Sequence, residues 1–495
     1  MTQAEPTSSL QRINRNQREI VRRVIVRGCL TLESPTGLGS GDADSPTDMP
    51  LLRDSISQHA LLTGSAIAGA LRNYLRDYEH NYGAAESQSD LATLLFGAIR
   101  REDDGDQSPL IVYDAISSTV PTIELRDGVK IDSKTGTASD KAKYDLEVLA
   151  AGTEFPLQFE LLIDQQADQN KLLQALAIAL QGLETGEIAL GMKKRRGFGR
   201  CKVSQWQVWN FDLTDPAQSR QWLEYDHWTP GLLSEPPARQ SSILTALSVN
   251  ALSVNLDELK DKRDRFTVQA TFTINGSLLI RSGQASMGRA PDVVHLKSYR
   301  NGELKPVLSG TSLAGVLRHR AERIINTLAP SSDGPNSLIS DLFGDVKEKT
   351  KTAQSSRLIV QEAEIENTCD LVQNRIAIDR FTGGALHGAL FDEQPIFGGE
   401  LTICLEVRKP KHCEMGLLLL LLKDLWTGDL PIGGESSIGR GRLQGKSAKI
   451  VHRYQGQRQE WTIDQVDQKL QVSDAQSLEK FVSDFVNQIS GRKAA

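Results

Sequence analysis

The chain has 495 residues, of which 39% are hydrophobic and 24% charged, and its formal net charge at pH 7 is −6. This composition excludes disordered and fibrous proteins, and the length predicts two or three domains. The longest apolar run, Met415–Leu422, is far shorter than the roughly 20 residues that span a bilayer. The polar N-terminus lacks a signal peptide's apolar segment, so we expect a cytoplasmic protein.

Cysteine content and local charge narrow the possible functions further. The five cysteines are scattered and form no CxxC pair, so we expect neither a disulfide framework nor a zinc site. The negative net charge argues against a nucleic-acid partner. However, Gly191–Lys202 contains six basic residues and no acidic one. Phosphate binding depends on where the positive charge lies more than on its total.

A repeat organises the chain. Five segments recur in the same order, 242 to 248 residues apart: Leu61–Arg72 with Val307–Arg318, Leu95–Gly97 with Leu342–Gly344, Leu110–Ala115 with Leu358–Ala363, Ile131–Gly136 with Ile378–Gly383, and Thr185–Arg200 with Thr427–Arg442. Chance does not produce such an ordered set, so the sequence indicates an internal duplication.

Each copy predicts the same elements in chain order. A strand near 24–32 or 266–274 leads through a loop to a helix that starts just after Ser65 or Ser312. Further strands, a second helix (Leu172–Leu183 or Met415–Leu425), a Gly-rich loop and a closing strand follow. This is the α+β, ferredoxin-like arrangement. Its sheet leaves one face open, as in RNA-recognition folds.

The expected boundaries follow from the repeat. They are an N-terminal tail (1–20), a first domain (21–205), a linker (206–263), a second domain (264–452) and a C-terminal extension (453–495). In the extension, Ser473 is a candidate cap for a helix with one apolar stripe, formed by Leu478, Phe481, Val482, Phe485 and Ile489. The stripe can dock on the second domain or on a neighbouring protein.

The two Gly-rich loops are candidate RNA-binding sites. Their residues are Lys193, Lys194, Arg195, Arg196, Gly197, Gly199 and Arg200 in the first copy, and Gly439, Arg440, Gly441 and Arg442 in the second. Glycine lets backbone amides approach a phosphate, but a plain hairpin turn needs glycine as well. The cations and the recurrence favour phosphate binding. The second loop contains Glu435 and fewer cations, so it is expected to bind less strongly.

The helix starts are a second candidate. Ser65 and Ser312 lie where free backbone amides can bind an anion, and Arg72 and Arg318 follow about two turns later. Simple capping with surface arginines explains the same residues.

Taken together, these motifs resemble the RAMP superfamily, specifically the Cas-seven-type backbone subunits of type III CRISPR–Cas effectors. The resemblance covers most of 21–205 and 263–445, and two such subunits in one chain are similar to the double-module proteins of type III-D. It implies two tandem ferredoxin-like RAMP domains with loop and thumb insertions. It also implies a prokaryotic subunit that stacks along a guide RNA.

The resemblance also implies cleavage and thumb residues. Family members that cut RNA carry an aspartate before the first helix, which matches Asp48 and, in a less certain register, Asp292. Asp42, Asp44 and Asp54 compete with Asp48. His295 is either a general acid or a surface histidine, and Arg53 and Lys297 either neutralise the phosphate or solvate the loop. The thumbs, which wedge between bases in the family, correspond to Thr135-Gly136 and Thr382-Gly383.

Three functions remain open. The first is a guide-binding subunit with a target-RNA endonuclease site in each module, which would use a divalent metal, expected to be Mg²⁺. The second is a subunit that binds the guide without cutting. The third is a stand-alone nuclease that processes precursor guide RNA. The expected partners are guide RNA, complementary target RNA, further backbone RAMP subunits, a large signature subunit and a small subunit, with no membrane.

Overall fold

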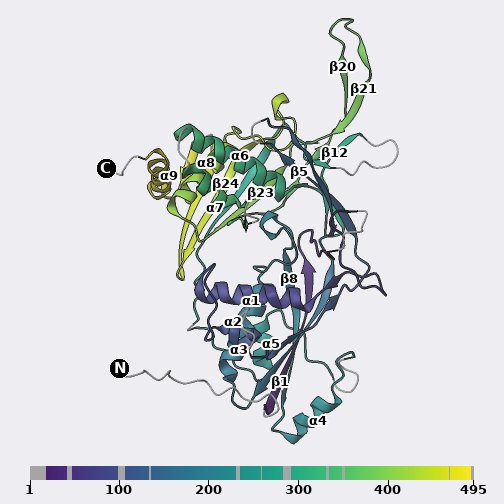
Figure 1. The fold of residues 1–495 in the computed structure, drawn as a ribbon, viewed down its shortest axis with the longest axis vertical. Helices are drawn as coiled ribbons and strands as arrows, with labels where there is room; N and C mark the ends of the chain where they lie inside the picture. Colours follow the sequence, from purple (N-terminus) through teal and green to yellow (C-terminus); the bar gives the residue numbers. More distant parts are fainter. Residues whose placement is uncertain are drawn as a thin grey trace, which may run out of the picture.

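The structure is a computed structural model. It describes residues 18–41, 47–97, 106–132, 135–229, 235–257, 259–282, 291–329, 334–347, 352–467 and 469–491. The chain forms two α+β modules, which lie one above the other in Figure 1 with the first at the bottom. Within these ranges, no helix is both long enough and apolar enough to cross a bilayer.

The first module is a four-stranded antiparallel sheet with helices on one face. Its main elements are β1 (Ile20–Leu32), α1 (Gly64–His80), β3 (Leu110–Val112), β7 (Glu154–Asp164), α3 (Gln169–Glu184) and β8 (Cys201–Asp212). The short elements β2 (Leu61–Leu62), α2 (Leu91–Phe96) and β4 (Ala115–Ile116) lie between them. The strand order β3-β7-β1-β8 is the ferredoxin-like order, which confirms the predicted fold.

The second module repeats this plan and enlarges the sheet. Its main elements are β9 (Arg265–Asn275), α6 (Gly310–Leu328), β17 (Leu358–Val360), β23 (Glu400–Arg408), α8 (His412–Trp426) and β24 (Arg442–Tyr454), with strand order β17-β23-β9-β24. The strands β25 (Gln457–Val466) and β26 (Lys469–Val472) extend the sheet beyond β24. On its other side lie β13 (Lys297–Arg300), β14 (Glu303–Leu308) and β18 (Ala363–Glu366). Further elements of this module are α7 (Gly334–Phe343), β10 (Ser277–Leu278), β11 (Arg281–Ser282), β12 (Val293–His295), β15 (Asp345–Lys347), β16 (Thr352–Gln354), β19 (Cys369–Asp370), β20 (Gln373–Ile378), β21 (Ala385–Gln394) and β22 (Ile396–Phe397).

The C-terminal helix α9 (Ala475–Ser490) docks on its own chain. Phe481 and Phe485 of its apolar stripe join the core of the second module, and Figure 1 shows α9 beside α8. A Cβ atom on Gly416 of α8 would lie 2.1 Å from the Phe481 carbonyl oxygen, so the close approach of the two helices requires glycine. Asp474, rather than Ser473, caps the helix by accepting a hydrogen bond from the Ser477 amide.

The linker covers both faces of the first sheet. The expected boundary at 205 falls inside β8, and α5 (Ile243–Val249) then packs on the helix-covered side. On the opposite face, the segment that includes α4 (Pro216–Glu224) packs Trp222 and Tyr225 against Trp209 and Phe211. Aromatic residues of the linker therefore cover one end of the sheet face that was predicted to be open. At the other end of this face, Pro156, Lys202 and Ser204 remain exposed.

The first module's Gly-rich loop packs directly against the second module. A Cβ atom on Gly197 would lie 2.3 Å from the Glu362 amide nitrogen, and one on Gly310 would lie 2.4 Å from the Arg196 carbonyl oxygen. Arg126 and Arg300, one from each module, form ion pairs with the Glu362 carboxylate at 3.3 and 2.5 Å. This carboxylate is 2% exposed. The modules are thus joined head to tail through a close backbone contact and a buried ion-pair network.

A second network joins the modules where the linker enters β9. Arg263 and Arg265 each form an ion pair with the Glu187 carboxylate at 2.6 Å, and the Tyr74 hydroxyl donates to it at 2.8 Å. Burial alone would raise the pKa of Glu187, but the two guanidinium groups outweigh burial and lower it to about 2.

Because its pKa falls on folding, the Glu187 carboxylate should stabilise the protein above about pH 4.5 and lose this effect as the pH approaches 2. The full effect is on the order of 3 kcal/mol. We predict that Glu187→Gln flattens the dependence of the unfolding free energy on pH between 6 and 3, as measured in urea. Glu224→Gln, at an exposed α4 pair with Arg220, is the control and should change little. Identical pH slopes for the wild type and Glu187→Gln would contradict the assignment.

Candidate nucleic-acid interface and acidic sites

The two aspartates expected to cut RNA occupy equivalent positions. The Asp48 carboxylate accepts a hydrogen bond from the Asp145 amide at 2.9 Å, and the Asp292 carboxylate accepts one from the Asp392 amide at 3.1 Å. Both aspartates are exposed. The next residue in each loop, Met49 or Val293, pairs in parallel with the following strand position. The register of the second loop, which the sequence left uncertain, is therefore the register expected.

Two of the competing aspartates, Asp42 and Asp44, lie outside the described residues. The third, Asp54, closes its own turn by accepting hydrogen bonds from the Ser57 amide and hydroxyl, both at 2.7 Å. These bonds lower the pKa of the Asp54 carboxyl. Its carboxylate is thus occupied locally, whereas that of Asp48 lies at the first thumb hairpin.

His295 is neither a general acid nor a surface histidine. It is 2% exposed; its Nδ1 accepts from the Ile280 amide at 3.2 Å, and its Nε2 donates to the Val307 carbonyl at 3.1 Å. Burial lowers the pKa of His295 to about 4. A neutral, enclosed imidazole holds β12 in place and has no access to a substrate. The two predictions for His295, a general acid or a surface histidine, are therefore both wrong.

The basic residues of the acidic loops already have partners. Arg53 forms an ion pair with Glu147 at 3.3 Å, and Lys297 forms one with Asp370 at 2.8 Å. Each side chain therefore supports the loop conformation in the absence of RNA.

Each module carries a hairpin at the expected thumb position. The first thumb is β5 (Ile123–Ile131) and β6 (Ala138–Leu149), and the second is β20 (Gln373–Ile378) and β21 (Ala385–Gln394). Figure 1 shows the second thumb projecting well beyond the body. The acidic loops contact the second strand of each hairpin at its base, so each thumb starts beside an aspartate.

The thumb tips share one turn. Gly136 and Gly383 donate their amides to the Asp132 and Asp379 carbonyls, both at 2.9 Å. Thr135 and Thr382 are exposed beside them. Sequence reasoning missed Phe381, which is 100% exposed at the second tip. An aromatic residue inside a polar turn, Asp379-Arg380-Phe381-Thr382, was the available signal.

The two Gly-rich loops have the same backbone. Each is a short 3-10 turn with left-handed residues at both ends, Lys193 and Gly197 or Glu435 and Gly439. A Cβ atom on Gly199 or Gly441 would lie 1.8 or 1.9 Å from a carbonyl oxygen of its own module. The close approach that these glycines permit is therefore to protein, which explains the motif without any ligand.

The cations of the first loop fall into two groups. Lys193 lies 3.8 Å over the Tyr144 ring, Arg196 donates to the Phe343 carbonyl at 3.1 Å, and Arg200 contacts Glu33 and Gln361 at 3.0 Å. In the described part of the chain, Lys194 and Arg195 have no hydrogen bond or ion pair on their side chains.

The electrostatics of the second group indicate positive charge that is only partly compensated. Desolvation and the neighbouring Arg408 lower the pKa of Arg195 to about 10, and desolvation and Arg195 lower the pKa of Lys194. Glu406 and Asp77 offset part of the charge of Arg195, but the lowered pKa values show that the neighbouring cations and burial outweigh them. Cations held close together attract an anion.

A comparison with protein families matches the RAMP superfamily at residues 29–202 and again at 271–444. The chain belongs to the RAMP superfamily. It contains two tandem RAMP domains, and membership implies a CRISPR-associated, RNA-binding subunit that works with other Cas subunits. No curated protein matches the chain.

In the second RAMP module, one predicted RNA contact is wrong. Arg440 is 4% exposed and forms ion pairs with Glu435 at 2.6 Å and with Glu393 at 3.1 Å. It also donates to Gln373 at 2.6 Å. Arg440 therefore joins the Gly-rich loop to both strands of the thumb, and its charge is neutralised. Gly439 and Arg442 are exposed, whereas Gly441 is buried.

The first RAMP module uses different chemistry at the same place. Leu146, Val148 and Phe198 form an apolar cluster there, with Tyr144 packed against it. In the second module, Arg375 also pairs with Glu393 at 3.0 Å and with Glu435 at 3.1 Å. Burial and the adjacent Glu435 raise the pKa of Glu393.

The helices of both RAMP modules start earlier than expected. They begin at Gly64 and Gly310, and the capping side chains are Thr63 and Ser309. Ser65 and Ser312 thus lie inside the first turn. Arg72 pairs with Glu86, and Arg318 pairs with Glu322 and donates to the Gly344 carbonyl.

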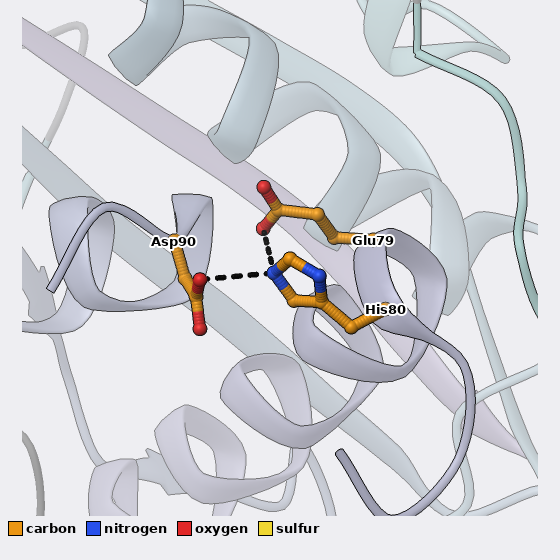
Figure 2. A group of neighbouring side chains, drawn as sticks. All are labelled: Glu79, His80 and Asp90. Atoms are coloured by element: carbon orange, nitrogen blue, oxygen red, sulfur yellow. Dashed lines mark hydrogen bonds and ion pairs between the residues drawn. The ribbon is translucent and has the colours of Figure 1, made fainter. Parts of the chain in front are cut away.

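Two other polar features of the RAMP modules resemble ligand-binding sites. Figure 2 shows the His80 imidazole between the carboxylates of Glu79 and Asp90, at 3.4 and 2.9 Å. These groups could hold a cation, but both carboxylates also accept backbone amides near the start of α2, from Leu91 and Ser87. The other feature is a cleft of about 520 Å³ between the modules. Three cations (Arg200, Lys202, Arg300) and three carboxylates (Glu33, Glu362, Glu364) line it, so it has no clear preference for anions.

We predict that Arg440→Ala destabilises the protein by about 3 kcal/mol, because it leaves the fully buried Glu393 with one fewer cation. Arg442→Ala is the matched control, since Arg442 is exposed in the same loop and should change stability by less than about 0.5 kcal/mol. Urea unfolding measures both. Weaker RNA binding by Arg440→Ala with unchanged stability would restore Arg440 as an RNA contact.

Proposed function

We propose that this RAMP protein is a guide-RNA-binding backbone subunit of a type III CRISPR effector, of the double-module III-D kind, and that each module cuts target RNA. The main observation in support is that Asp48 and Asp292 occupy equivalent positions in the two modules. Each is an exposed aspartate held by a thumb-strand amide, although the two loops differ in sequence. Two loops that diverged in sequence yet keep one carboxylate in one geometry favour a functional reason for that carboxylate.

The proposed reaction needs little from the protein. RNA supplies its own nucleophile, the 2′-hydroxyl, so the enzyme must mainly hold an in-line geometry at one phosphate. The thumb can unstack a base, and the exposed Phe381 suits this role in the second module. Asp48 or Asp292 then accepts the hydroxyl proton as the 2′-oxygen bonds to phosphorus and the bond from phosphorus to the 5′-oxygen breaks. The products are a 2′,3′-cyclic phosphate and a 5′-hydroxyl, which takes its proton from water.

A divalent metal, expected to be Mg²⁺, would supply charge stabilisation at the phosphate. The residues fit this ion, because Asp48 and Asp292 each offer exposed carboxylate oxygens at the base of a thumb. Carboxylate oxygens are the ligands that Mg²⁺ prefers.

The guide RNA is proposed to bind where the first Gly-rich loop carries cations that form no ion pair. Lys194 and Arg195 lie at the contact between the modules, and their side chains form no ion pair with an acid among the described residues. Phosphates of a guide RNA would neutralise this charge, and a target strand paired to that guide would pass the two thumbs. Further RAMP subunits, a large subunit and a small subunit would complete the complex.

The alternatives have less support. A guide-processing nuclease centred on a histidine does not fit His295, which is enclosed. A non-cutting subunit would not need two equivalent carboxylates, and the aspartate variants below separate it from the proposal.

We predict that Asp48→Ala abolishes one cut in a guide-paired target RNA and Asp292→Ala abolishes the other, because each module acts on its own phosphate. The loss should be at least about 100-fold in rate, as expected when a positioned proton acceptor is removed. Product lengths on a denaturing gel measure each cut. Asp54→Ala, in the same loop, is the control and should retain both cuts. Unchanged cleavage by the double Asp48/Asp292 variant, with assembly intact, would reject the catalytic role.

We predict that replacing Lys194 and Arg195 together by Ala weakens guide RNA binding equally for all sequences. The slope of log K against log salt should become shallower by about 1.4, the value for two phosphate contacts to single-stranded RNA. Replacing Lys171 and Arg220 together is the control, because these cations are 64% and 80% exposed on α3 and α4. A loss confined to certain RNA sequences would contradict backbone binding.

A further inference from the structure

One carboxylate spans the acidic loop of the first module. Glu147, on the thumb strand β6, accepts hydrogen bonds from the Thr47 hydroxyl at 3.4 Å and from the Leu51 amide at 3.3 Å. It also forms an ion pair with Arg53 at 3.3 Å. Its side chain is 18% exposed. Glu147 therefore contacts the loop on both sides of Asp48.

The backbone of the same strand completes the contact. The Glu147 amide donates to the Met49 carbonyl at 3.2 Å, and the Asp145 amide donates to the Asp48 carboxylate at 2.9 Å. Backbone bonds thus orient Asp48, and the Glu147 carboxylate holds the loop residues that flank it. Without this carboxylate, the Leu51 amide and Arg53 lose their partner, and the loop has fewer constraints.

The second module holds its aspartate by other means. The position equivalent to Glu147 is Gln394, which pairs in parallel with Val294 of β12. That loop is a true strand with a neighbour on each side, β11 and β21, and the buried His295 anchors it. In the described part of the first module's loop, the backbone pairing consists of isolated bridges, at Gly39–Leu51, Met49–Leu146 and Arg53–Ala60, in place of a strand. In the first module, the contacts of the Glu147 carboxylate, here called the carboxylate clamp, take the place of the strand pairing that holds the second loop.

We propose that Glu147 is a positioning residue of the first acidic site, which holds the loop so that the Asp48 carboxylate keeps its place beside the thumb. Glu147 acts through the loop and does not touch the reacting phosphate. This inference rests on the proposed cleavage at Asp48. It adds that the two sites depend on different supports, so one residue controls the first cut alone.

The two cuts in one target RNA provide an internal comparison. The experiment uses the complex purified with its guide RNA and measures single-turnover rates of both cuts, which Asp48→Ala and Asp292→Ala assign to the modules. Glu147→Ala should slow the first cut by about 10- to 100-fold, the loss expected when a reacting group is misplaced by about 1 Å. The second cut, target affinity and melting temperature should stay within about twofold or 2 °C of the wild type.

Two further variants test the reason for the effect. Glu147→Gln keeps an oxygen that can accept from Leu51 and Arg53, so the first cut should recover to within about threefold of the wild-type rate. Gln394→Ala is the matched control in the second module and should leave both cuts unchanged, because strand pairing holds that loop.

The outcomes separate the two proposals. If Asp48→Ala leaves the first cut intact, both the proposed cleavage role and this inference fail. If Asp48→Ala abolishes that cut but Glu147→Ala leaves it at the wild-type rate, only the inference fails. The inference also fails if Glu147→Ala slows both cuts equally and lowers the melting temperature, because Glu147 would then support the whole thumb.

Discussion

The backbone contact between Gly197 and Glu362 is the constraint on which the arrangement of the two modules depends. At this separation only glycine fits, and the Glu362 carboxylate is buried between an arginine of each module. Removing one arginine would leave the buried Glu362 carboxylate with a single cation, and moving one module relative to the other would break this pairing. Because the same loop carries Lys194 and Arg195, the contact that joins the modules also concentrates positive charge between them.

The duplication kept the backbone and changed the chemistry that supports it. Both Gly-rich loops have the same left-handed ends, and both thumbs turn on the same aspartate and glycine. The first thumb base packs Leu146 against Phe198, whereas the second joins Glu393 to Arg440. Apolar packing and an ion-pair network respond differently to salt and pH. The two modules can therefore differ in stability while presenting similar surfaces.

The two acidic sites likewise share a backbone geometry but differ in the contacts that support it. A parallel pairing beside each thumb places an exposed aspartate at its base, and this pairing tolerates the loss of most of the loop motif in the second copy. The supports differ again, a carboxylate clamp in the first module and strand pairing with a buried histidine in the second. Conserved geometry with different supports suggests that the position of the aspartate is the property that both loops retain.

The sequence alone determined the duplication and the ferredoxin-like order, because these depend on local motifs and hydrophobic periodicity that repeat in order. Its resemblance to a family pointed to the thumb turns and to Asp48 and Asp292. The sequence did not reveal that Arg440 is neutralised, that His295 is enclosed or that linker aromatics cover one end of the first sheet's open face. These properties depend on partners far away in the chain. An arginine or a histidine has the same sequence signal whether it faces solvent or a buried acid, so only the tertiary structure decides which charges remain available to RNA.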